Sequence, residues 1–109
     1  MPFVELLSLE RCRLEGGTFV THSNRELAVF RFREPDRVFV IDNACPHAGG
    51  NLSGGEVRDE IVTCPWHQWQ FDLRSGCCTH SSLARVRCYP AEIRDGVVWV
   101  DLPDLQTGN

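Results

Sequence analysis

The sequence places four side chains that can bind metal in two close pairs. Cys45 and His47 are separated by one residue, Cys64 and His67 by two, and sixteen residues lie between the pairs. Thiolate and imidazole groups bind zinc, and they also bind iron in iron–sulfur clusters. Each pair lies in a proline-containing loop after a short apolar stretch, so chance is an unsatisfactory explanation. The spacing therefore predicts either a zinc site or an iron–sulfur cluster.

The order of the ligand types bears on this choice. Structural zinc sites usually take two cysteines from one loop and, when histidines are present, two histidines from another. Here each loop supplies one cysteine and one histidine. This mixed order suits a site with two metal ions, in which both cysteines bind one ion and both histidines bind the other. The pattern favours two similar loops that clasp a binuclear cluster.

The composition is typical of one globular domain. The 109 residues are enough for one core, and 42% of them are hydrophobic. The net charge of −4 argues against nucleic-acid binding; it fits an ordinary soluble surface and would suit a positively charged redox partner. No apolar run approaches the roughly 20 residues of a membrane-spanning helix, and no signal peptide is recognisable. We therefore expect a cytoplasmic protein with no membrane partner.

Outside the two pairs the chain has four further cysteines: Cys12, Cys77, Cys78 and Cys88. In a reducing compartment we expect them to be free structural thiols and not disulfides. The adjacent Cys77 and Cys78 should point to opposite faces of a strand. The histidines outside the pairs, His22 and His80, are expected to be ordinary surface or loop residues.

Short alternating apolar runs predict that strands position the two pairs. Ala28, Phe30 and Phe32 share one face of a strand, and the segment EPDR forms a turn into a second strand at residues 38–41. Asp95-Gly96 predicts another hairpin, because a type I′ turn requires positive φ at both central residues. A third hairpin is expected around residues 75–76, and the segment SLERC could form one helical turn. The chain is predicted to be all-β, with about eight to ten strands in a sandwich or small barrel.

Residues 43–70 differ from the rest of the chain. They are rich in Gly, Pro and His, with one obvious strand near residues 60–63, and loop regions of this length are usually functional. Here the stretches VFVIDNACPHAGGNLSGGEV and IVTCPWHQWQFDLRSG resemble the Rieske-type 2Fe-2S ferredoxins, the soluble ferredoxins of ring-hydroxylating dioxygenases. The resemblance extends from about residue 3 to residue 102, and it favours iron over zinc.

The resemblance implies a fold, a cofactor and a ligand set. The fold would be an all-β, Rieske-type antiparallel β-sandwich of stacked sheets, with a small cluster-binding subdomain at one tip. We expect a single domain over residues 1–109, with the subdomain at about residues 43–71 and a flexible tail at residues 103–109. The cofactor would be one 2Fe-2S cluster, with one iron held by Cys45 and Cys64 and the other by His47 and His67.

The residues around these ligands predict a low reduction potential. Two neutral imidazoles remove negative charge, so Rieske potentials lie at roughly −150 to +300 mV, against about −400 mV for plant-type ferredoxins. High-potential members of the family have hydroxyl groups two and four residues after the second histidine, and a disulfide between the cluster loops. Here Trp69 and Phe71 replace the hydroxyls, and Gly50 and Trp66 stand around the cysteine positions. We therefore expect roughly −150 to 0 mV.

Two features depart from the family pattern. Gln68 stands where the family commonly has Gly, so the second loop must do without the freedom of glycine at positive φ. The segment at residues 80–85 lacks the proline of the loop that usually shields the cluster. Around the histidines we expect an apolar docking rim, formed by Pro46, Ala48, Trp66 and Leu83.

The predicted function is electron transfer and not catalysis. Every iron of such a cluster has four ligands, so no position is open for a substrate, and no competing catalytic motif is recognisable. The resemblance implies a one-electron carrier between a flavin-containing reductase and a terminal oxygenase or other redox enzyme. The alternatives are a cluster-bearing small subunit of an assimilatory nitrite reductase and a redox-sensing module. The Rieske subunit of an oxygenase fits less well, because it continues into a large domain and this sequence ends soon after Asp101.

Overall fold

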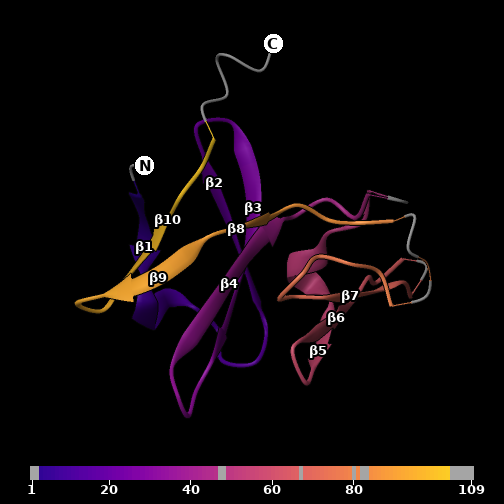
Figure 1. The fold of residues 1–109 in the computed structure, drawn as a ribbon, viewed down its shortest axis with the longest axis horizontal. Coiled ribbons are helices and arrows are strands. Elements are labelled where there is room, and N and C mark those ends of the chain that lie inside the picture. Colours follow the sequence, from indigo (N-terminus) through magenta and orange to yellow (C-terminus); the bar gives the residue numbers. More distant parts are fainter. Residues whose placement is uncertain (1–2, 47–48, 67, 80, 82–83, 104–109) are drawn as a thin grey trace.

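The computed structural model describes residues 3–46, 49–66, 68–79, 81 and 84–103. They form three antiparallel sheets with two short 3-10 helices, η1 (Leu9–Arg11) and η2 (Leu52–Gly54) (Figure 1). Within these ranges, no helix has the length and apolar character needed to cross a membrane. The strands are β1 (Val4–Ser8), β2 (Gly17–His22), β3 (Arg25–Phe32), β4 (Arg37–Asp42), β5 (Glu56–Arg58), β6 (Ile61–Thr63), β7 (Gln70–Asp72), β8 (Cys88–Tyr89), β9 (Ala91–Arg94) and β10 (Val97–Val100).

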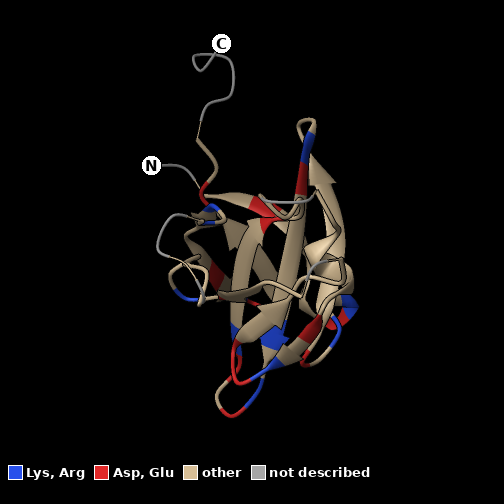
Figure 2. Ribbon diagram, turned by 90° about the vertical axis from the view of Figure 1, so that its right-hand side faces the viewer, with Lys and Arg blue, Asp and Glu red and all other residues tan. Residues whose placement is uncertain are grey.

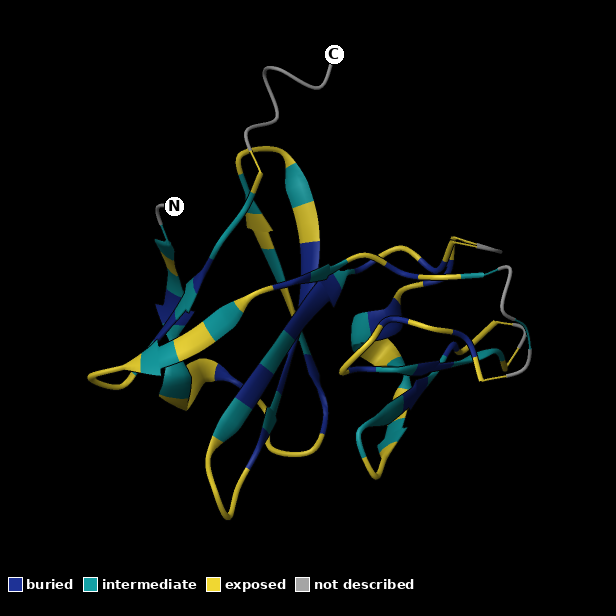
Figure 3. Ribbon diagram, in the orientation of Figure 1, coloured by how far each residue is buried: buried dark blue, intermediate teal, exposed yellow. Residues whose placement is uncertain are grey.

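The strand orders are β1-β10-β9, β2-β3-β4-β8 and β5-β6-β7, and the four-stranded sheet lies between the other two (Figure 1). The alternation predicted for β3 is present, but both of its faces are buried (Figure 3). Ala28 and Phe30 belong to a core shared with the β5-β6-β7 sheet, whereas Leu27 and Val29 belong to a core shared with the β1-β10-β9 sheet. The all-β fold of stacked antiparallel sheets is therefore confirmed.

The hairpin predicted at Asp95-Gly96 joins β9 to β10, and both turn residues have positive φ, 50° and 75°. The hairpin between β3 and β4 is also confirmed. Two further hairpins have two-residue turns with positive φ and no glycine. Ser23-Asn24 joins β2 to β3 with φ of 51° and 68°, and Asp59-Glu60 joins β5 to β6 with φ of 52° and 64°. The sequence did not predict these two turns, because the usual glycine is missing from both.

Residues 43–70 contain more regular structure than the sequence predicted. The expected strand near residues 60–63 is β6, but β5 and η2 precede it and β7 begins at Gln70. After β7 the chain turns at Gly76, whose N–H donates to the carbonyl of Asp72 at 2.7 Å, and Phe71 pairs with Cys78. This is the third predicted hairpin. The helical turn predicted in SLERC is η1, without a capping hydrogen bond from the Ser8 side chain.

Candidate metal centre

Two six-residue loops carry the predicted ligands, and both close with the same hydrogen bonds. We call residues 45–50 the first loop and residues 64–69 the second loop. In the first loop the Cys45 N–H donates to the Gly50 carbonyl at 2.8 Å, and the Gly49 N–H donates to the Cys45 carbonyl at 2.7 Å. In the second loop, Cys64 donates to Trp69 at 2.7 Å and Gln68 to Cys64 at 3.0 Å. Each cysteine therefore anchors its loop at both ends.

The base of each loop is an antiparallel residue pair at equivalent positions. Ala44 pairs with Asn51 beneath the first loop, and Thr63 pairs with Gln70 beneath the second, where β6 meets β7. Both pairs place the residue before the cysteine opposite the sixth residue after it. The two loops are thus built alike, as the mixed order of ligands in the sequence predicted.

The fifth residue of each loop has a left-handed backbone. Gly49 has φ of 77°, and Gln68 has φ of 60°. Glycine adopts this conformation without steric cost, whereas other residues do so at a cost of about 1–2 kcal/mol. The expectation that the second loop must manage without glycine is confirmed, and the loop keeps the same backbone path in spite of it. The hydrogen bond from the Gln68 N–H to the Cys64 carbonyl holds that path.

Both cysteine side chains are buried, at 2% exposure for Cys45 and 0% for Cys64, and both are free thiols. Burial raises the pKa of the Cys64 thiol, and the neighbouring Cys45 thiol raises it further. The two sulfur atoms therefore belong to one site. Gly50 allows the loops to approach, since a Cβ atom there would lie 3.1 Å from the Cys64 sulfur and 3.1 Å from Cγ of Trp66. The two positions compared with the family disulfide, Gly50 and Trp66, are thus close enough that a side chain at position 50 would meet the Trp66 ring.

Asn43 fixes the first loop and was missed in the sequence. Its side chain is 1% exposed; Nδ2 donates to Oδ1 of Asn51 at 2.9 Å, and Oδ1 accepts from the Ser53 N–H at 3.0 Å. Its backbone N–H donates to Glu26 on β3, and its carbonyl accepts from Leu52. One buried amide thus connects the entry and exit of the first loop to the central sheet. Its place two residues before Cys45 was the only signal available.

The surroundings of the two thiols are apolar. Phe71 is fully buried in the same core as Cys45 and Cys64, and Trp69 packs against that core. Trp66, in contrast, is 61% exposed, and Pro46 is also exposed. Packing of the loop therefore does not account for the whole Trp66 ring. The other two residues of the predicted docking rim, Ala48 and Leu83, lie outside the described residues.

Both predicted histidine ligands, His47 and His67, also lie outside the described residues, as does His80. Among the residues that the structure does describe, no group of three possible metal ligands is found. In the segment at residues 80–85, Ala84 packs against the core, and its carbonyl accepts a hydrogen bond from the Cys78 N–H at 3.1 Å. His22 is half-buried, and its Nδ1 has no hydrogen-bond partner.

None of the other four cysteines forms a disulfide. Cys77 is exposed and Cys78 is buried, so the prediction that these neighbours point in opposite directions is confirmed. Burial raises the pKa of the Cys12 thiol and also that of the Cys88 thiol. Both thiols are therefore held in the protonated form, which is the less reactive one.

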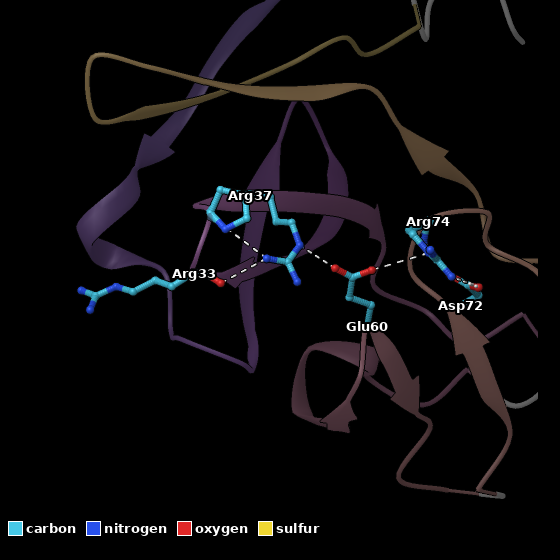
Figure 4. Close-up of polar contacts among 6 residues, drawn as sticks. Arg33, Arg37, Glu60, Asp72 and Arg74 are labelled. Atoms are coloured by element: carbon cyan, nitrogen blue, oxygen red, sulfur yellow. Dashed lines mark hydrogen bonds and ion pairs between the residues drawn. The ribbon is translucent and has the colours of Figure 1, made fainter.

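Ion pairs connect the sheet that carries the second loop to the central sheet (Figure 4). Glu60, in the turn between β5 and β6, accepts from Nε of Arg37 at 2.5 Å and lies 3.5 Å from Nε of Arg74. Arg74 in turn pairs with Asp72 at 3.4 Å, while Nη1 of Arg37 donates to the Arg33 carbonyl at 3.2 Å. Glu60 thus joins the two sheets electrostatically.

Comparison with known families gives a match over most of the chain. The model of the Rieske [2Fe-2S] domain matches residues 7–90. Cholesterol 7-desaturase nvd of Drosophila melanogaster is 42% identical over 73 residues, covering 64% of this chain and 17% of that protein. The anthranilate 1,2-dioxygenase ferredoxin subunit of Burkholderia cepacia is 38% identical over 79 residues, covering 72% of this chain and 71% of that subunit. The chain therefore spans less than a fifth of the desaturase, but most of the ferredoxin subunit.

Solved structures with this fold include two kinds of protein. A ferredoxin of Sphingomonas yanoikuyae B1 is 28% identical with a TM-score of 0.79, covering 94% of this chain and all of that one. A protein described as an NADH-dependent nitrite reductase small subunit from Mycobacterium tuberculosis has a TM-score of 0.84, covering 95% of this chain and 97% of that one. At 22% identity, the second likeness concerns the fold alone.

Proposed function

We propose that this chain, which belongs to the Rieske [2Fe-2S] domain family, passes single electrons from a flavin-containing reductase to a terminal oxygenase. It carries a Rieske 2Fe-2S cluster, and it is an electron-transfer component and not an enzyme. The observation that carries the proposal is the pair of equivalent loops, which present two buried thiols to one site. The match to most of a dioxygenase ferredoxin subunit supports the choice of partners.

We assign Cys45 and Cys64 to one iron, and His47 and His67 to the other. The described half of this ligand set fits the cluster, because the two thiols are buried together and Gly50 leaves room beside the Cys64 sulfur. When bound, the cluster accepts and releases one electron. A raised pKa of the Cys64 thiol means that the metal must displace a proton for this cysteine to bind as thiolate.

The chain contributes a rigid and dry environment for this chemistry. The hydrogen bonds that close both loops fix the cysteine backbones, so little rearrangement is needed when the charge of the site changes. Phe71 excludes water from the cysteine side of the site and offers no hydrogen-bond donor. An apolar and donor-poor environment disfavours the added electron, which supports a potential at the low end of the Rieske range.

The four cysteines outside the ligand set form no disulfide, which supports a reducing compartment, and we include a cytoplasmic location in the proposal on that ground. A second candidate is the cluster-bearing small subunit of an assimilatory nitrite reductase. It is favoured by the fold of the M. tuberculosis protein, which this chain shares over nearly its whole length. The two candidates differ in whether the chain moves between partners or stays bound to one.

Reconstitution distinguishes the two candidates. We would combine the purified chain with the reductase and oxygenase components of the anthranilate 1,2-dioxygenase system and follow both cluster reduction and substrate oxidation. A carrier should be reduced and reoxidised repeatedly, and substrate turnover should depend on its concentration. If the oxygenase does not reoxidise the reduced chain, and the chain forms a stable complex with a nitrite reductase catalytic subunit instead, the carrier proposal is wrong.

A further inference from the structure

Seven exposed residues in the described part of the two loops and their base form what we call the loop-end surface: Ala44, Pro46, Gly49, Asn51, Pro65, Trp66 and Gln68. Trp66 provides its largest apolar group, with 61% of its surface exposed. The loop-end surface adjoins the buried thiols, because a Cβ atom at Gly50 would lie 3.1 Å from the Cys64 sulfur and 3.1 Å from Cγ of Trp66. We therefore assign the exit of the electron towards a partner to this surface.

The chain around this surface is uncharged over three long stretches. Residues 44–55, 61–71 and 75–84 contain no Asp, Glu, Lys or Arg. These stretches make up roughly a third of the chain, so a charged fraction of 24% would place about eight charges in them. Figure 2 faces this end of the molecule and shows the charged residues in the surrounding turns and strands. The neutrality is therefore local, in a chain with a net charge of −4.

The charged residues nearest the ends of these stretches are Asp42, Glu56, Glu60, Asp72, Arg74 and Arg85. Three of them form ion pairs. Glu60 pairs with Arg37 and with Arg74, and Arg74 also pairs with Asp72 (Figure 4). Two carboxylates and two guanidinium groups thus carry no net charge between them. Because these four charges are paired and sum to zero, the electrostatic potential that they produce at the loop-end surface is weak, and water and salt screen it over a short distance.

From these observations, and resting on the proposed function, we propose that the electron acceptor binds the loop-end surface through an uncharged apolar recess that receives the Trp66 ring. Binding of this kind removes no charged side chain from water, so its main free-energy cost is the ordering of side chains at the interface. An exposed tryptophan at the centre of a small neutral surface is the type of residue that supplies most of the binding energy. Charge on the rest of the molecule contributes little to recognition.

The neutrality can be tested without a protein partner. We would reduce the purified protein and measure its oxidation by ferricyanide, an anion, at low and high ionic strength. Gln68→Glu should slow the reaction at low salt by at least about threefold, because the new charge lies beside the exit path. Thr21→Glu, an exposed site on β2, should change the rate less than about twofold. Equal effects of the two substitutions would show that the loop-end surface is not where electrons leave.

The docking claim is tested with the oxygenase component used in the reconstitution. Trp66→Ala should lower the second-order rate of electron transfer by about tenfold or more, with an unchanged reduction potential and EPR spectrum. Phe19→Ala removes another exposed aromatic, 50% exposed and on β2, and should leave the rate within about twofold. For the wild type, raising NaCl from about 50 to 500 mM should change the rate by less than about threefold.

The apolar docking mode would be overturned if raising NaCl lowered the wild-type electron-transfer rate tenfold. It would also be overturned if Trp66→Ala and Phe19→Ala lowered the rate equally. The salt series on the wild type decides the matter if Trp66→Ala does not incorporate its cluster. Absence of any electron transfer to the oxygenase would contradict the proposed function itself. The ferricyanide experiment would still report on the charge of the loop-end surface, so the two failures can be told apart.

Discussion

Gln68 has the backbone conformation that Gly49 has in the other loop, but it carries a side chain. The conformation persists because the neighbouring hydrogen bonds of the second loop, from Cys64 to Trp69 and from Gln68 to Cys64, require it. The backbone strain at Gln68 is therefore a consequence of the hydrogen bonds that close the second loop. The Gln68 side chain is exposed, so it points into solvent and does not have to be packed against other residues.

Substitutions at Gln68 and Gly49 test whether the left-handed backbone at Gln68 is strained. Gln68→Gly should raise the free energy of unfolding by about 0.5–1 kcal/mol, because relief of the left-handed strain exceeds the extra entropy of glycine in the unfolded chain. Gly49→Ala should lower it by about 1 kcal/mol; no atom lies within 4 Å of the added Cβ, so backbone strain is the only cost. Urea unfolding of both variants measures the effects. Destabilisation by Gln68→Gly would contradict the strain argument.

Phe71 sets the second prediction at this scale. It is buried with both cysteines and stands where high-potential members of the family have a hydroxyl donor. Phe71→Tyr should raise the reduction potential, by at most roughly 130 mV if the hydroxyl makes a full hydrogen bond to a charged group.

The control for that experiment is Phe71→Leu, which removes aromatic volume without adding a donor and should leave the potential nearly unchanged. Protein-film voltammetry at one pH compares the three proteins. A potential that does not rise in the tyrosine variant, or one that rises equally in the leucine variant, would contradict the prediction that the missing hydroxyl lowers the potential.

The sequence predicted that Cys45 and Cys64 lie in two similar loops, and it predicted the anomaly at Gln68, because both depend on residue type and local spacing. Asn43 was not identified, because its importance depends on four hydrogen bonds to residues at 26 and 51–53. Burial of an amide cannot be inferred from a polar residue in a loop. The histidine assignment was made from spacing and stays a prediction, since both side chains lie outside the described residues.

At the scale of elements, two-residue turns show where sequence patterns succeed. Asp95-Gly96 was predicted because glycine marks positive φ, whereas Ser23-Asn24 and Asp59-Glu60 adopt the same conformation without one. For Asp59-Glu60 a reason is visible in the structure. The turn places the Glu60 carboxylate between Arg37 and Arg74, so pairing across two sheets helps to offset the cost of the backbone conformation.

Glu60→Gln should therefore weaken the junction between the two sheets. The substitution keeps the shape of the side chain and removes its charge, and loss of the Arg37 pair should cost about 0.5–1 kcal/mol in the free energy of unfolding at low salt. Glu92→Gln breaks an exposed pair with Arg94 within one hairpin and should have no measurable effect. Urea unfolding at low and high salt tests both. Equal effects of the two substitutions would mean that Glu60 has no special role.

Tyr89 gives the central sheet a defined response to high pH. Burial and the hydrogen bond that its hydroxyl donates to Asp42 raise the pKa of Tyr89 to about 12. The unfolded chain loses this proton near pH 10, so between about pH 10 and 12 the unfolded state binds fewer protons than the folded state. The stabilisation is therefore complete below pH 10 and is lost as pH rises, by about 2–3 kcal/mol.

This pH response is measurable because the chain contains one tyrosine. Ultraviolet titration should show ionisation near pH 12 in the folded protein and near pH 10 in urea. In Tyr89→Phe the decline of stability from pH 10 to 12 should become shallower. Ionisation of the folded protein near pH 10 would contradict the burial and hydrogen bonding described for this side chain.

At the scale of the whole molecule, the three stacked sheets form two separate hydrophobic cores. The central sheet buries both of its faces, so the β1-β10-β9 sheet can complete one core while the β5-β6-β7 sheet and the two loops complete the other. Alternation in the sequence predicted strands and an all-β fold. It could not predict that both faces of β3 are buried, since an apolar residue on the second face, such as Val29, is equally compatible with a solvent-exposed sheet. The stacking was implied by the family resemblance and is confirmed.

The distribution of charge is also a property of the whole molecule. A net charge of −4 fits an ordinary soluble surface and would suit a positively charged redox partner, whereas the stretches that form the two loops contain no charged residue. Total charge describes the far field and says little about a contact surface of a few residues. For predicting a contact surface, the positions of the charged residues along the chain are more useful than the net charge, once the loops have been placed in the fold.

The EPR spectrum of the reduced, purified protein tests the central claim most directly. A 2Fe-2S cluster with two cysteine and two histidine ligands should give a red-brown protein whose reduced-state signal averages near g of about 1.9. A colourless protein that contains zinc and gives no signal on reduction would contradict the ligand assignment and the electron-transfer function together.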